Sequence, residues 1–339
     1  EKTLTRPELS ILMAYSKMQL YQALLESDLP GHQALAGYLE AYFPERLRAD
    51  YRGRLAEHPL AREITATVLT NEIVDQAGSV FLNRLVQRTG VPLARAAEAY
   101  LIFDQVLDAG KLRRAIWAGD NRLDAARQHQ LLLDLEGTIG SLCEWALDRG
   151  LDVALDGEVV EHYRDRVEHY RKAWSGLYSD ADWEAVKERM TQLQEEGFSE
   201  DEARTLATLD RFEDFLPLLE LVEHTDSDFY SVARTYSEVR RVLDLQSVLR
   251  GMAEVPLRDR WDRMAQQAVV SAFIQGAFRL TAAVFAEADG NPESFLGRRR
   301  PQNRAYQGLR DRLRGTVPTN FHPYTVLARA LESLAETHS

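Results

Sequence analysis

The sequence predicts an all-α protein, an irregular multi-helix bundle rather than a repeat array. Apolar residues recur at helical spacing along most of the chain, and capping residues, glycine and proline mark where successive helices begin and end. Almost no segment alternates apolar and polar residues at period two, so we expect no sheet and no βαβ unit. A chain of 339 residues is longer than one core usually supports. Two helical subdomains, 1–150 and 151–339, fit this length, and so does a single domain.

The first helix has the strongest start signal. Thr5 and Glu8 have the spacing of a capping box, in which each side chain accepts a hydrogen bond from the backbone amide of the other residue. Pro7 stands in the first turn, where its missing N–H costs nothing. Behind this cap we expect a helix that ends near Asp28. Related capping patterns recur at Ser179 with Asp182 and at Ser199 with Glu202.

Further helices follow at intervals marked by glycine and proline. A helix over 59–89 has a broad apolar stripe, and its length predicts a central packing element. Gly90 and Pro92 end it. The same signals predict helices over residues 34–42, 44–57, 93–107, 124–149, 158–174, 180–196, 199–212, 217–223, 229–252, 257–289, 302–314 and 323–337. The weakest signals lie at 151–157 and 290–300, and either segment is a candidate subdomain junction.

Composition restricts the compartment and the partners. The formal net charge of −12 disfavours a general affinity for nucleic acid or for anionic membranes. The single cysteine, Cys143, cannot form an internal disulfide, so we expect a cytoplasmic protein. The most apolar stretch, 268–288, is interrupted by Gln275, Arg279 and Glu287, and we interpret it as a buried helix, not a membrane span. The chain begins without an initiator methionine or a visible secretory signal, and we expect it to be part of a longer polypeptide.

Residues that could perform chemistry are sparse. Dinucleotide binding needs a glycine-rich turn between a strand and a helix. The nearest pattern, Gly137 with Gly140, lies in a helical segment, where small residues let two helices approach, so we expect no cofactor in this chain. Cys143 is expected to be a buried apolar residue. One helix face has metal-ligand residue types, which a solvated face with charge pairs explains equally well, and we expect no metal there: Glu158, His162, Asp165 and His169.

Two polar residues lie one turn apart near the apolar stripe of the 59–89 helix. Asn71 and Asp75 are flanked by Val68 and Gly78. Polar groups that face a packed seam need hydrogen-bond partners. This pair therefore either fixes the helix register through a buried network, which we favour, or lines a contact with another domain or subunit.

Charge is distributed unevenly over the second half of the chain. Residues 180–226 hold fifteen acidic side chains against four basic ones, whereas residues 298–314 hold seven arginines against Asp311. Solvated faces and pairing within the chain are one explanation. The other is that the arginine segment docks on an acidic surface of a neighbouring domain or subunit, and nucleic acid is a weaker alternative. The candidate contact residues are Arg298, Arg299, Arg300 and Arg304.

Several strings of residues resemble a known family. Residues 4–17 read LTRPELSILMAYSK, and residues 62–67, 71–74, 78–81 and 83–85 read REITAT, NEIV, GSVF and NRL. They are similar to the segment after the catalytic region, and to the long-helix motif, of the large NAD-specific glutamate dehydrogenases of bacteria. Residues 99–101, Val106 and Trp117 follow in the family's order, with a weaker similarity at 260–281. Ser79 stands where the family is expected to have proline, and Asp75 where asparagine is usual.

The resemblance implies a parent enzyme that oxidises L-glutamate to 2-oxoglutarate and ammonium with NAD, in a large homo-oligomeric polypeptide. None of the family's NAD-binding or glutamate-binding residues falls on this sequence, so no catalytic residue is assigned and NAD is expected only in the parent enzyme. The implied role is a C-terminal helical scaffold or regulatory domain that packs on the catalytic domain of the same polypeptide. Two rivals stay open: an independent helical interaction module, and an enzyme with an unrecognised helical active site.

Overall fold

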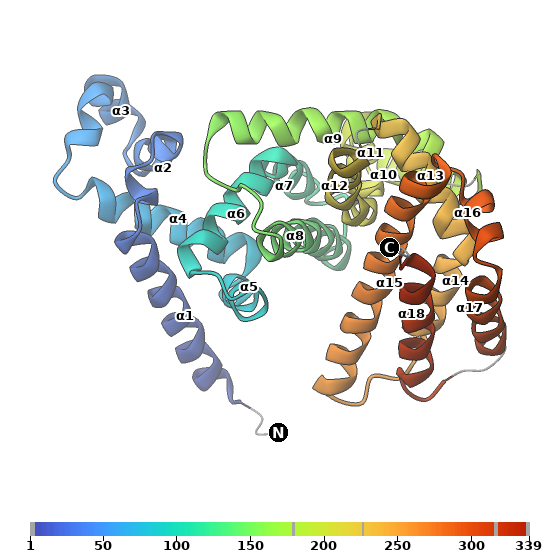
Figure 1. Ribbon diagram of the computed structural model, residues 1–339. Coiled ribbons are helices and arrows are strands. Elements are labelled where there is room, and N and C mark those ends of the chain that lie inside the picture. Colours follow the sequence, from blue (N-terminus) through green and yellow to red (C-terminus); the bar gives the residue numbers. More distant parts are fainter. Residues whose placement is uncertain (1–3, 178–179, 226, 315–317, 337–339) are drawn as a thin grey trace. The chain divides into compact units, whose positions relative to one another are not determined.

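The computed structural model describes residues 4–177, 180–225, 227–314 and 318–336 (Figure 1). Over these residues the chain forms eighteen α-helices and four short 3₁₀ helices, and it contains no strand. The prediction of an all-α, multi-helix fold is therefore confirmed.

The chain divides into two compact units. Unit 1 comprises residues 1–168 and 184–216, and unit 2 comprises residues 169–183 and 217–339. Three helices contribute residues to both units: α9 (Gly157–Leu177), α10 (Asp180–Glu195) and α12 (Phe215–Thr225). This grouping differs from the predicted ranges 1–150 and 151–339, because residues after 150 belong to both units. The predicted division into subdomains 1–150 and 151–339 stays a prediction.

Unit 1 is built around α6 (Leu93–Val106), most of whose residues are buried. A helix that is apolar around its circumference belongs inside a core, and α6 contacts α1, α5, α7 and α8. The other elements that lie wholly in unit 1 are α1 (Arg6–Glu26), η1 (Leu29–Gly31), η2 (Gln33–Leu35), α2 (Ala36–Tyr42), α3 (Glu45–Tyr51), η3 (Arg52–Glu57), α4 (Ala61–Ala77), α5 (Phe81–Thr89), α7 (Ala109–Trp117), α8 (Ala125–Asp148), α11 (Glu200–Ala207) and η4 (Leu209–Asp214).

Unit 2 is built around α15 (Arg260–Ala288), which contacts four other helices of this unit. It packs tightly against α18 at Gly276, where an added Cβ would come within 2.7 Å of Leu331 Cδ2. Only glycine leaves room for the leucine there. The other helices that lie wholly in unit 2 are α13 (Phe229–Leu243), α14 (Leu245–Ala253), α16 (Pro292–Arg298), α17 (Arg300–Leu313) and α18 (His322–Ala335).

Two predicted helix caps are present in the structure. The Glu8 carboxylate accepts from the Thr5 amide at 2.8 Å, and the Thr5 hydroxyl accepts from the Glu8 amide. Ser199 and Glu202 make the same reciprocal pair at the start of α11, where the carboxylate lies 2.9 Å from the serine amide. Both capping-box predictions are confirmed. The third predicted cap, at Ser179, lies outside the described residues.

The helix predicted over 59–89 is wrong, because the structure contains two helices there. Gly78 ends α4 with φ 88°, a backbone conformation that residues with a Cβ rarely adopt. The first of them, α4, contacts α1 and α2, whereas α6 contacts four α-helices of unit 1. The helix predicted over 229–252 is also divided, at Asp244 with φ 53°, into α13 and α14.

Two of the α-helices, α7 and α16, were not predicted from the sequence. α7 follows α6 after Asp108, which adopts a left-handed conformation with φ 52°. α16 lies in the segment 290–300, one of the two candidate subdomain junctions. Its signal is present in the sequence, because Asn291 caps the helix by accepting from the Ser294 amide at 2.9 Å and Pro292 follows at the first helical position.

One described helix, Trp261–Ala288, is long and apolar enough to cross a membrane by length and composition. In the structure, 44% of its most apolar window is buried. Gln275 and Arg279 lie on its exposed side, and buried apolar residues such as Phe273 lie on the other. A core helix of a globular unit has the same composition. The prediction that this chain has no membrane partner stays a prediction.

Candidate functional site

A buried cluster of charged and polar side chains links four helices of unit 1. Arg113 of α7 is 1% exposed. Its Nε donates to Glu136 Oε1 of α8 at 2.7 Å, and its Nη1 donates to Asp104 Oδ1 of α6 at 2.5 Å. Its Nη2 donates at 2.9 Å to the Tyr100 hydroxyl, which lies 3.1 Å from Gln76 Oε1 of α4 and from Glu136 Oε2. These five residues are called the Arg113 cluster below.

Burial dominates the electrostatics of the Arg113 cluster. It raises the pKa of Asp104 and of Glu136, although the Arg113 guanidinium acts on both in the opposite direction. Burial also raises the pKa of the Tyr100 hydroxyl, with the Glu136 carboxylate as the next cause. One cation, the Arg113 guanidinium, thus lies between two buried carboxylates, and hydrogen bonds join all members of the cluster. Such an arrangement fixes the register of the helices that it joins.

The predicted polar pair on α4 lies next to this cluster. Asn71 is half-buried and Asp75 is exposed, and within the described part of the chain neither side chain has a hydrogen-bond partner. The network instead uses the residues one position further on, since Gln76 Nε2 donates to Glu72 Oε1 at 3.2 Å and Gln76 also lies beside Tyr100. One position is a rotation of about 100° around a helix. A contact role for Asn71 and Asp75 stays a prediction.

A second buried arginine lies in the arginine-rich segment. Arg299 is 7% exposed. Its Nη1 donates to the carbonyl oxygens of Leu334, at 3.0 Å, and of Glu336 at the end of α18. Its Nη2 donates to Glu287 Oε1 of α15 at 2.7 Å, and its guanidinium carbon lies 4.4 Å from the centroid of the Phe295 ring. Arg299 therefore caps the C-terminus of α18 within unit 2.

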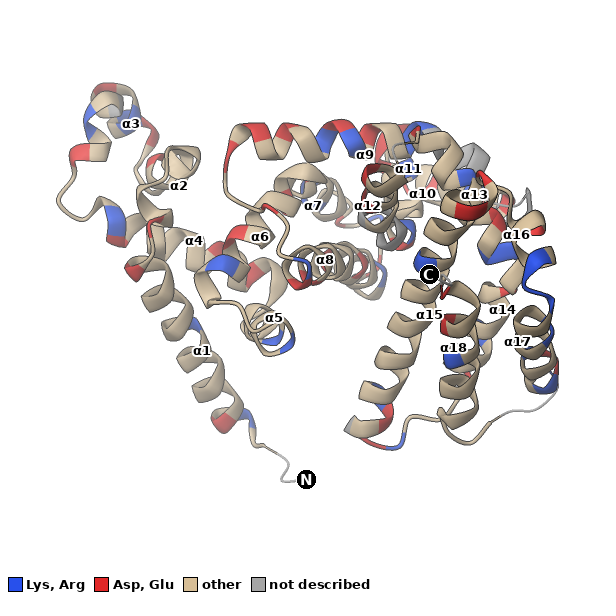
Figure 2. Ribbon diagram, in the orientation of Figure 1, with Lys and Arg blue, Asp and Glu red and all other residues tan. Residues whose placement is uncertain are grey.

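The other three predicted arginines have different surroundings. Arg298 is exposed and donates from Nη1 to the Glu287 carbonyl oxygen at 2.7 Å. Arg300 and Arg304 are exposed one turn apart on α17, and neither pairs with another described residue. Figure 2 shows further basic residues along this helix. A docking role for the four arginines stays a prediction, and Arg300 and Arg304 are the two whose side chains are available for it.

Where it is described, the acidic segment 180–226 is partly paired within itself. Arg189 Nη2 lies 3.1 Å from Asp210 Oδ1, and Arg204 Nη2 lies 2.8 Å from Glu200 Oε1. All four side chains are at least two-fifths exposed, so each pair contributes less than about 1 kcal/mol. Pairing within the chain thus explains part of the charge asymmetry without providing much stability.

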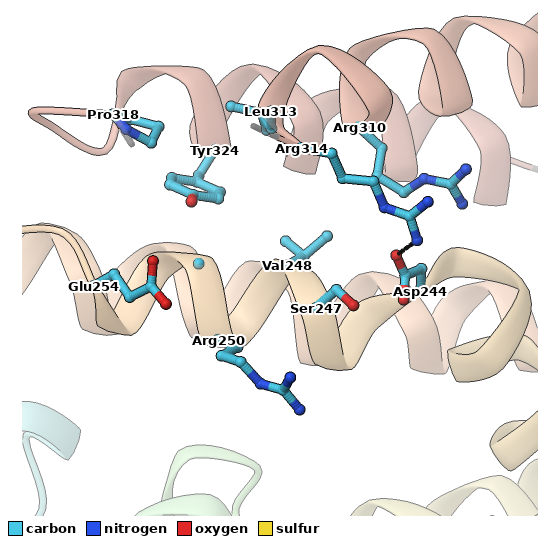
Figure 3. A pocket seen from close by; sticks show the side chains of 11 residues that line it. Asp244, Ser247, Val248, Arg250, Glu254, Arg310, Leu313, Arg314, Pro318 and Tyr324 are labelled. Carbon is cyan, nitrogen blue, oxygen red and sulfur yellow. Dashed lines mark hydrogen bonds and ion pairs between the residues drawn. The ribbon is translucent and has the colours of Figure 1, made fainter. Parts of the chain in front are cut away.

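A cavity of about 360 Å³ lies in unit 2 beside α14, α17 and α18 (Figure 3). Its volume suits a small molecule. The arginines at the end of α17 are already engaged, however, because Arg314, the residue after the helix, pairs with Asp244, and Arg310 Nη2 donates to Asp311 at 2.9 Å. Two of the cations at this cavity are therefore already paired within unit 2. Its lining consists of Asp244, Ser247, Val248, Arg250, Gly251, Glu254, Arg310, Leu313, Arg314, Pro318 and Tyr324.

The remaining candidate residues form no reactive site in the described parts of the chain. Cys143 is buried, and burial raises the pKa of its thiol well above the usual value, which keeps it neutral. Gly140 of α8 faces Phe81 of α5, whose Cε2 lies 3.1 Å from an added Cβ, whereas Gly137 faces open space. The described residues contain no group of three or more His, Cys, Asp and Glu side chains that could hold a metal ion. This includes the α9 face with Glu158, His162, Asp165 and His169.

The Arg113 cluster itself was not predicted from the sequence. α7, which contains Arg113, follows Asp108, whose side chain makes no capping hydrogen bond, and no helix was predicted there from the sequence. One signal was available in α8, where Glu136 stands among the apolar residues Leu135 and Ile139. A carboxylate within an apolar stripe needs a buried partner, although the sequence does not identify which cation provides it.

Comparison with known proteins gives the family. The family model described as "Glutamate dehydrogenase, C-terminal" matches residues 1–333. The chain is 27% identical over 343 residues to an NAD-specific glutamate dehydrogenase of Halomonas elongata and 28% identical over 343 residues to one of Pseudomonas aeruginosa. These matches cover 99% and 98% of this chain but 21% of each relative. An NAD-specific glutamate dehydrogenase of Mycobacterium tuberculosis is 29% identical over 267 residues, which cover 78% of this chain and 16% of the relative.

The chain therefore spans about a fifth of the length of the first two relatives. The resemblance found in its sequence is confirmed over nearly all of its residues, and not only over the first third, where the similar strings lie. This chain belongs to the glutamate dehydrogenase C-terminal family and corresponds to the C-terminal region of the large NAD-specific glutamate dehydrogenases.

Proposed function

We propose that this chain is the non-catalytic helical scaffold of a large NAD-specific glutamate dehydrogenase. The observation that carries the proposal is the extent of the match, which includes residues 1–333 of this chain and only a fifth of each of the first two relatives. Most of each relative lies outside the match, and the proposal assigns the dehydrogenase chemistry to that part. There the parent enzyme converts L-glutamate, NAD and water to 2-oxoglutarate, ammonium and NADH.

Two features of the fold support a scaffold role. The described residues form helices, whereas a dinucleotide site of the doubly wound type needs a strand that leads into a glycine-rich turn. The two buried arginines, Arg113 and Arg299, each join several helices of one unit through hydrogen bonds. A unit whose helices are held in fixed register presents a constant surface to its neighbours, which is what a scaffold requires.

The partners follow from the same proposal. The first is the catalytic domain of the same polypeptide, and the second is a further copy of the parent enzyme in a homo-oligomer. The proposed compartment is the cytoplasm, in line with the single, buried cysteine. The net charge of −12 disfavours nucleic acid and anionic membranes as partners. Regulation of the catalytic domain is a further proposed task, for which Arg300 and Arg304 offer exposed cations.

The test compares three proteins: the full-length parent polypeptide, the parent without this region, and the 339-residue chain. We expect glutamate-dependent NADH formation from the full-length protein and none from the chain. In titration calorimetry the chain should bind neither NAD nor glutamate, and micromolar binding of either would contradict a non-catalytic role. An independent interaction module predicts instead that the parent without this region keeps its activity and its oligomeric state.

A further inference from the structure

The first half of α1 is the most apolar exposed part of unit 1. Between Leu4 and Met18, seven large apolar side chains are 45–63% exposed. The charged residues of this stretch are only Arg6, Glu8 and Lys17, and Figure 2 shows the helix as almost uncharged along this length. Exposed apolar surface on this scale marks an interaction site. The seven residues are Leu4, Leu9, Ile11, Leu12, Met13, Tyr15 and Met18.

The second half of the same helix is firmly packed. Leu20 and Leu24 are buried, and α1 contacts α4 and α6. Arg62 of α4 holds the C-terminal end of α1, because its Nη2 donates to the carbonyl oxygens of Leu25, at 2.8 Å, and Ser27, at 2.6 Å. The exposed first half is therefore the extension of an anchored, regular helix (Figure 1).

The exposed apolar residues lie on two opposite sides of α1. At about 100° per residue, Leu9, Leu12 and Met13 continue the stripe that holds Leu20 and Leu24. Ile11, Tyr15 and Met18 lie roughly opposite. A helix that meets a partner on one side needs only one apolar stripe, whereas a helix that is apolar on both sides is enclosed. A flat partner, or a second α1 packed against the first, would leave one of the two stripes in water.

We propose that the first half of α1 inserts into an apolar groove on the preceding part of the parent polypeptide, which covers both stripes. This inference rests on the proposed function. The family is described as C-terminal and the chain covers 21% of its first two relatives, so in the relatives α1 lies next to a large preceding polypeptide. That polypeptide is long enough to form a groove around about three helical turns, and its tether to α1 keeps the effective concentration high.

The test measures how fast single cysteines on the two sides of α1 react with a maleimide. Ile11→Cys and Leu12→Cys are prepared in the 339-residue chain and in the full-length parent polypeptide. The modified peptides are identified by mass spectrometry, so that other cysteines of the parent do not interfere. The native Cys143 is buried. Ala126→Cys and Glu293→Cys, at exposed positions in units 1 and 2, are the controls, and a thermal melt of each variant checks that it folds.

We expect both α1 variants to react at least about tenfold more slowly in the full-length protein than in the chain, while the controls react at similar rates in both. Equal α1 rates in the two proteins, or protection of only one side, would overturn the proposal. Slow labelling in the chain alone that becomes faster on dilution would also overturn it, since a second copy would then cover α1. Glutamate-dependent NADH formation by the full-length variants tests the proposed function separately, whichever labelling pattern is found.

Discussion

Two of the described arginines are buried, one in each unit, and their partners differ in kind. In unit 1, Arg113 is surrounded by side chains, namely two carboxylates and a tyrosine hydroxyl. In unit 2, Arg299 bonds mainly to backbone carbonyls at the end of α18, and its one carboxylate partner, Glu287, is a third exposed. Carboxylates carry charge and titrate, whereas carbonyl groups do neither. The two sites should therefore differ in the cost of losing the arginine and in how that cost depends on pH.

Replacing Arg113 with methionine should cause the largest loss of stability. Methionine keeps much of the apolar volume but leaves the carboxylates of Asp104 and Glu136 buried without a cation. Breaking a buried pair in this way costs about 3–5 kcal/mol. We expect the free energy of unfolding of the chain, from urea denaturation at neutral pH, to fall by this amount. The control is Arg304→Met on the exposed face of α17, which should change it by less than about 0.5 kcal/mol.

The cost of Arg113→Met should also shrink on acidification. Burial already raises the pKa of Asp104 and Glu136 in the folded chain, and removal of the cation raises it further. A raised folded pKa gives stability that is fully present below the unfolded pKa and is lost as pH rises through the folded pKa. The variant should therefore recover as pH falls from neutral, and the recovery should be complete near the unfolded value of about 4. A loss that does not vary with pH would show that charge on these carboxylates is not what makes Arg113 important.

Arg299→Met should cost less and should depend little on pH. The carbonyl groups of Leu334 and Glu336 would lose a charged donor, but neither group carries a charge, and the Glu336 carbonyl is only partly buried. Hydrogen bonds to charged groups contribute about 1.5–3 kcal/mol each, and we expect a loss in the lower part of this range. Hydrogen exchange should become faster in the last turns of α18 and stay unchanged in α6. A loss equal to that of Arg113→Met, with the same pH dependence, would remove the distinction between the two sites.

The sequence predicted features whose partners lie close together along the chain. The caps at Thr5 and Ser199 were predicted because each partner lies three residues further on. The breaks between helices were harder. Asp244 adopts a left-handed conformation although the apolar helical pattern continues across it, so the periodicity gave no warning.

Burial of the arginines could not be predicted locally. Arg299 and Arg300 are adjacent and identical in type, yet the first is buried and the second is exposed. The difference comes from Leu334, which lies 35 positions away in the sequence. Likewise Arg113 and Glu136 are separated by 23 positions and a helix boundary. Capping and periodicity signals involve residues only a few positions apart, so the Arg113 cluster could be identified only from the tertiary structure.

The two units also differ in how tightly their helices pack at a glycine. Gly276→Ala in unit 2 places a Cβ within 2.8 Å of both Cγ and Cδ2 of the buried Leu331. Such overpacking costs about 1–3 kcal/mol, of which the better helix propensity of alanine offsets up to about 1 kcal/mol. Gly140→Ala in unit 1 meets only the edge of the Phe81 ring, at 3.1 Å, and should be nearly neutral. Thermal melts of both variants measure these losses of stability, and a larger loss for Gly140→Ala than for Gly276→Ala would contradict the prediction.

Ser199→Ala should give a small loss, and its pH dependence distinguishes an exposed carboxylate from the buried ones. Removing the serine cap costs about 0.5–1 kcal/mol, and Ser199→Thr, which keeps the hydroxyl, is the control. Hydrogen bonds from the Ser199 side chain and amide lower the pKa of Glu202. A lowered folded pKa gives stability that is present above the unfolded pKa and is lost as pH falls through the folded pKa. The losses from Ser199→Ala and Arg113→Met should therefore both fade on acidification, the first below and the second above the ordinary carboxylate pKa. Urea titrations at a series of pH values distinguish these two ranges, and a common range would mean that Glu136 is solvated much as Glu202 is.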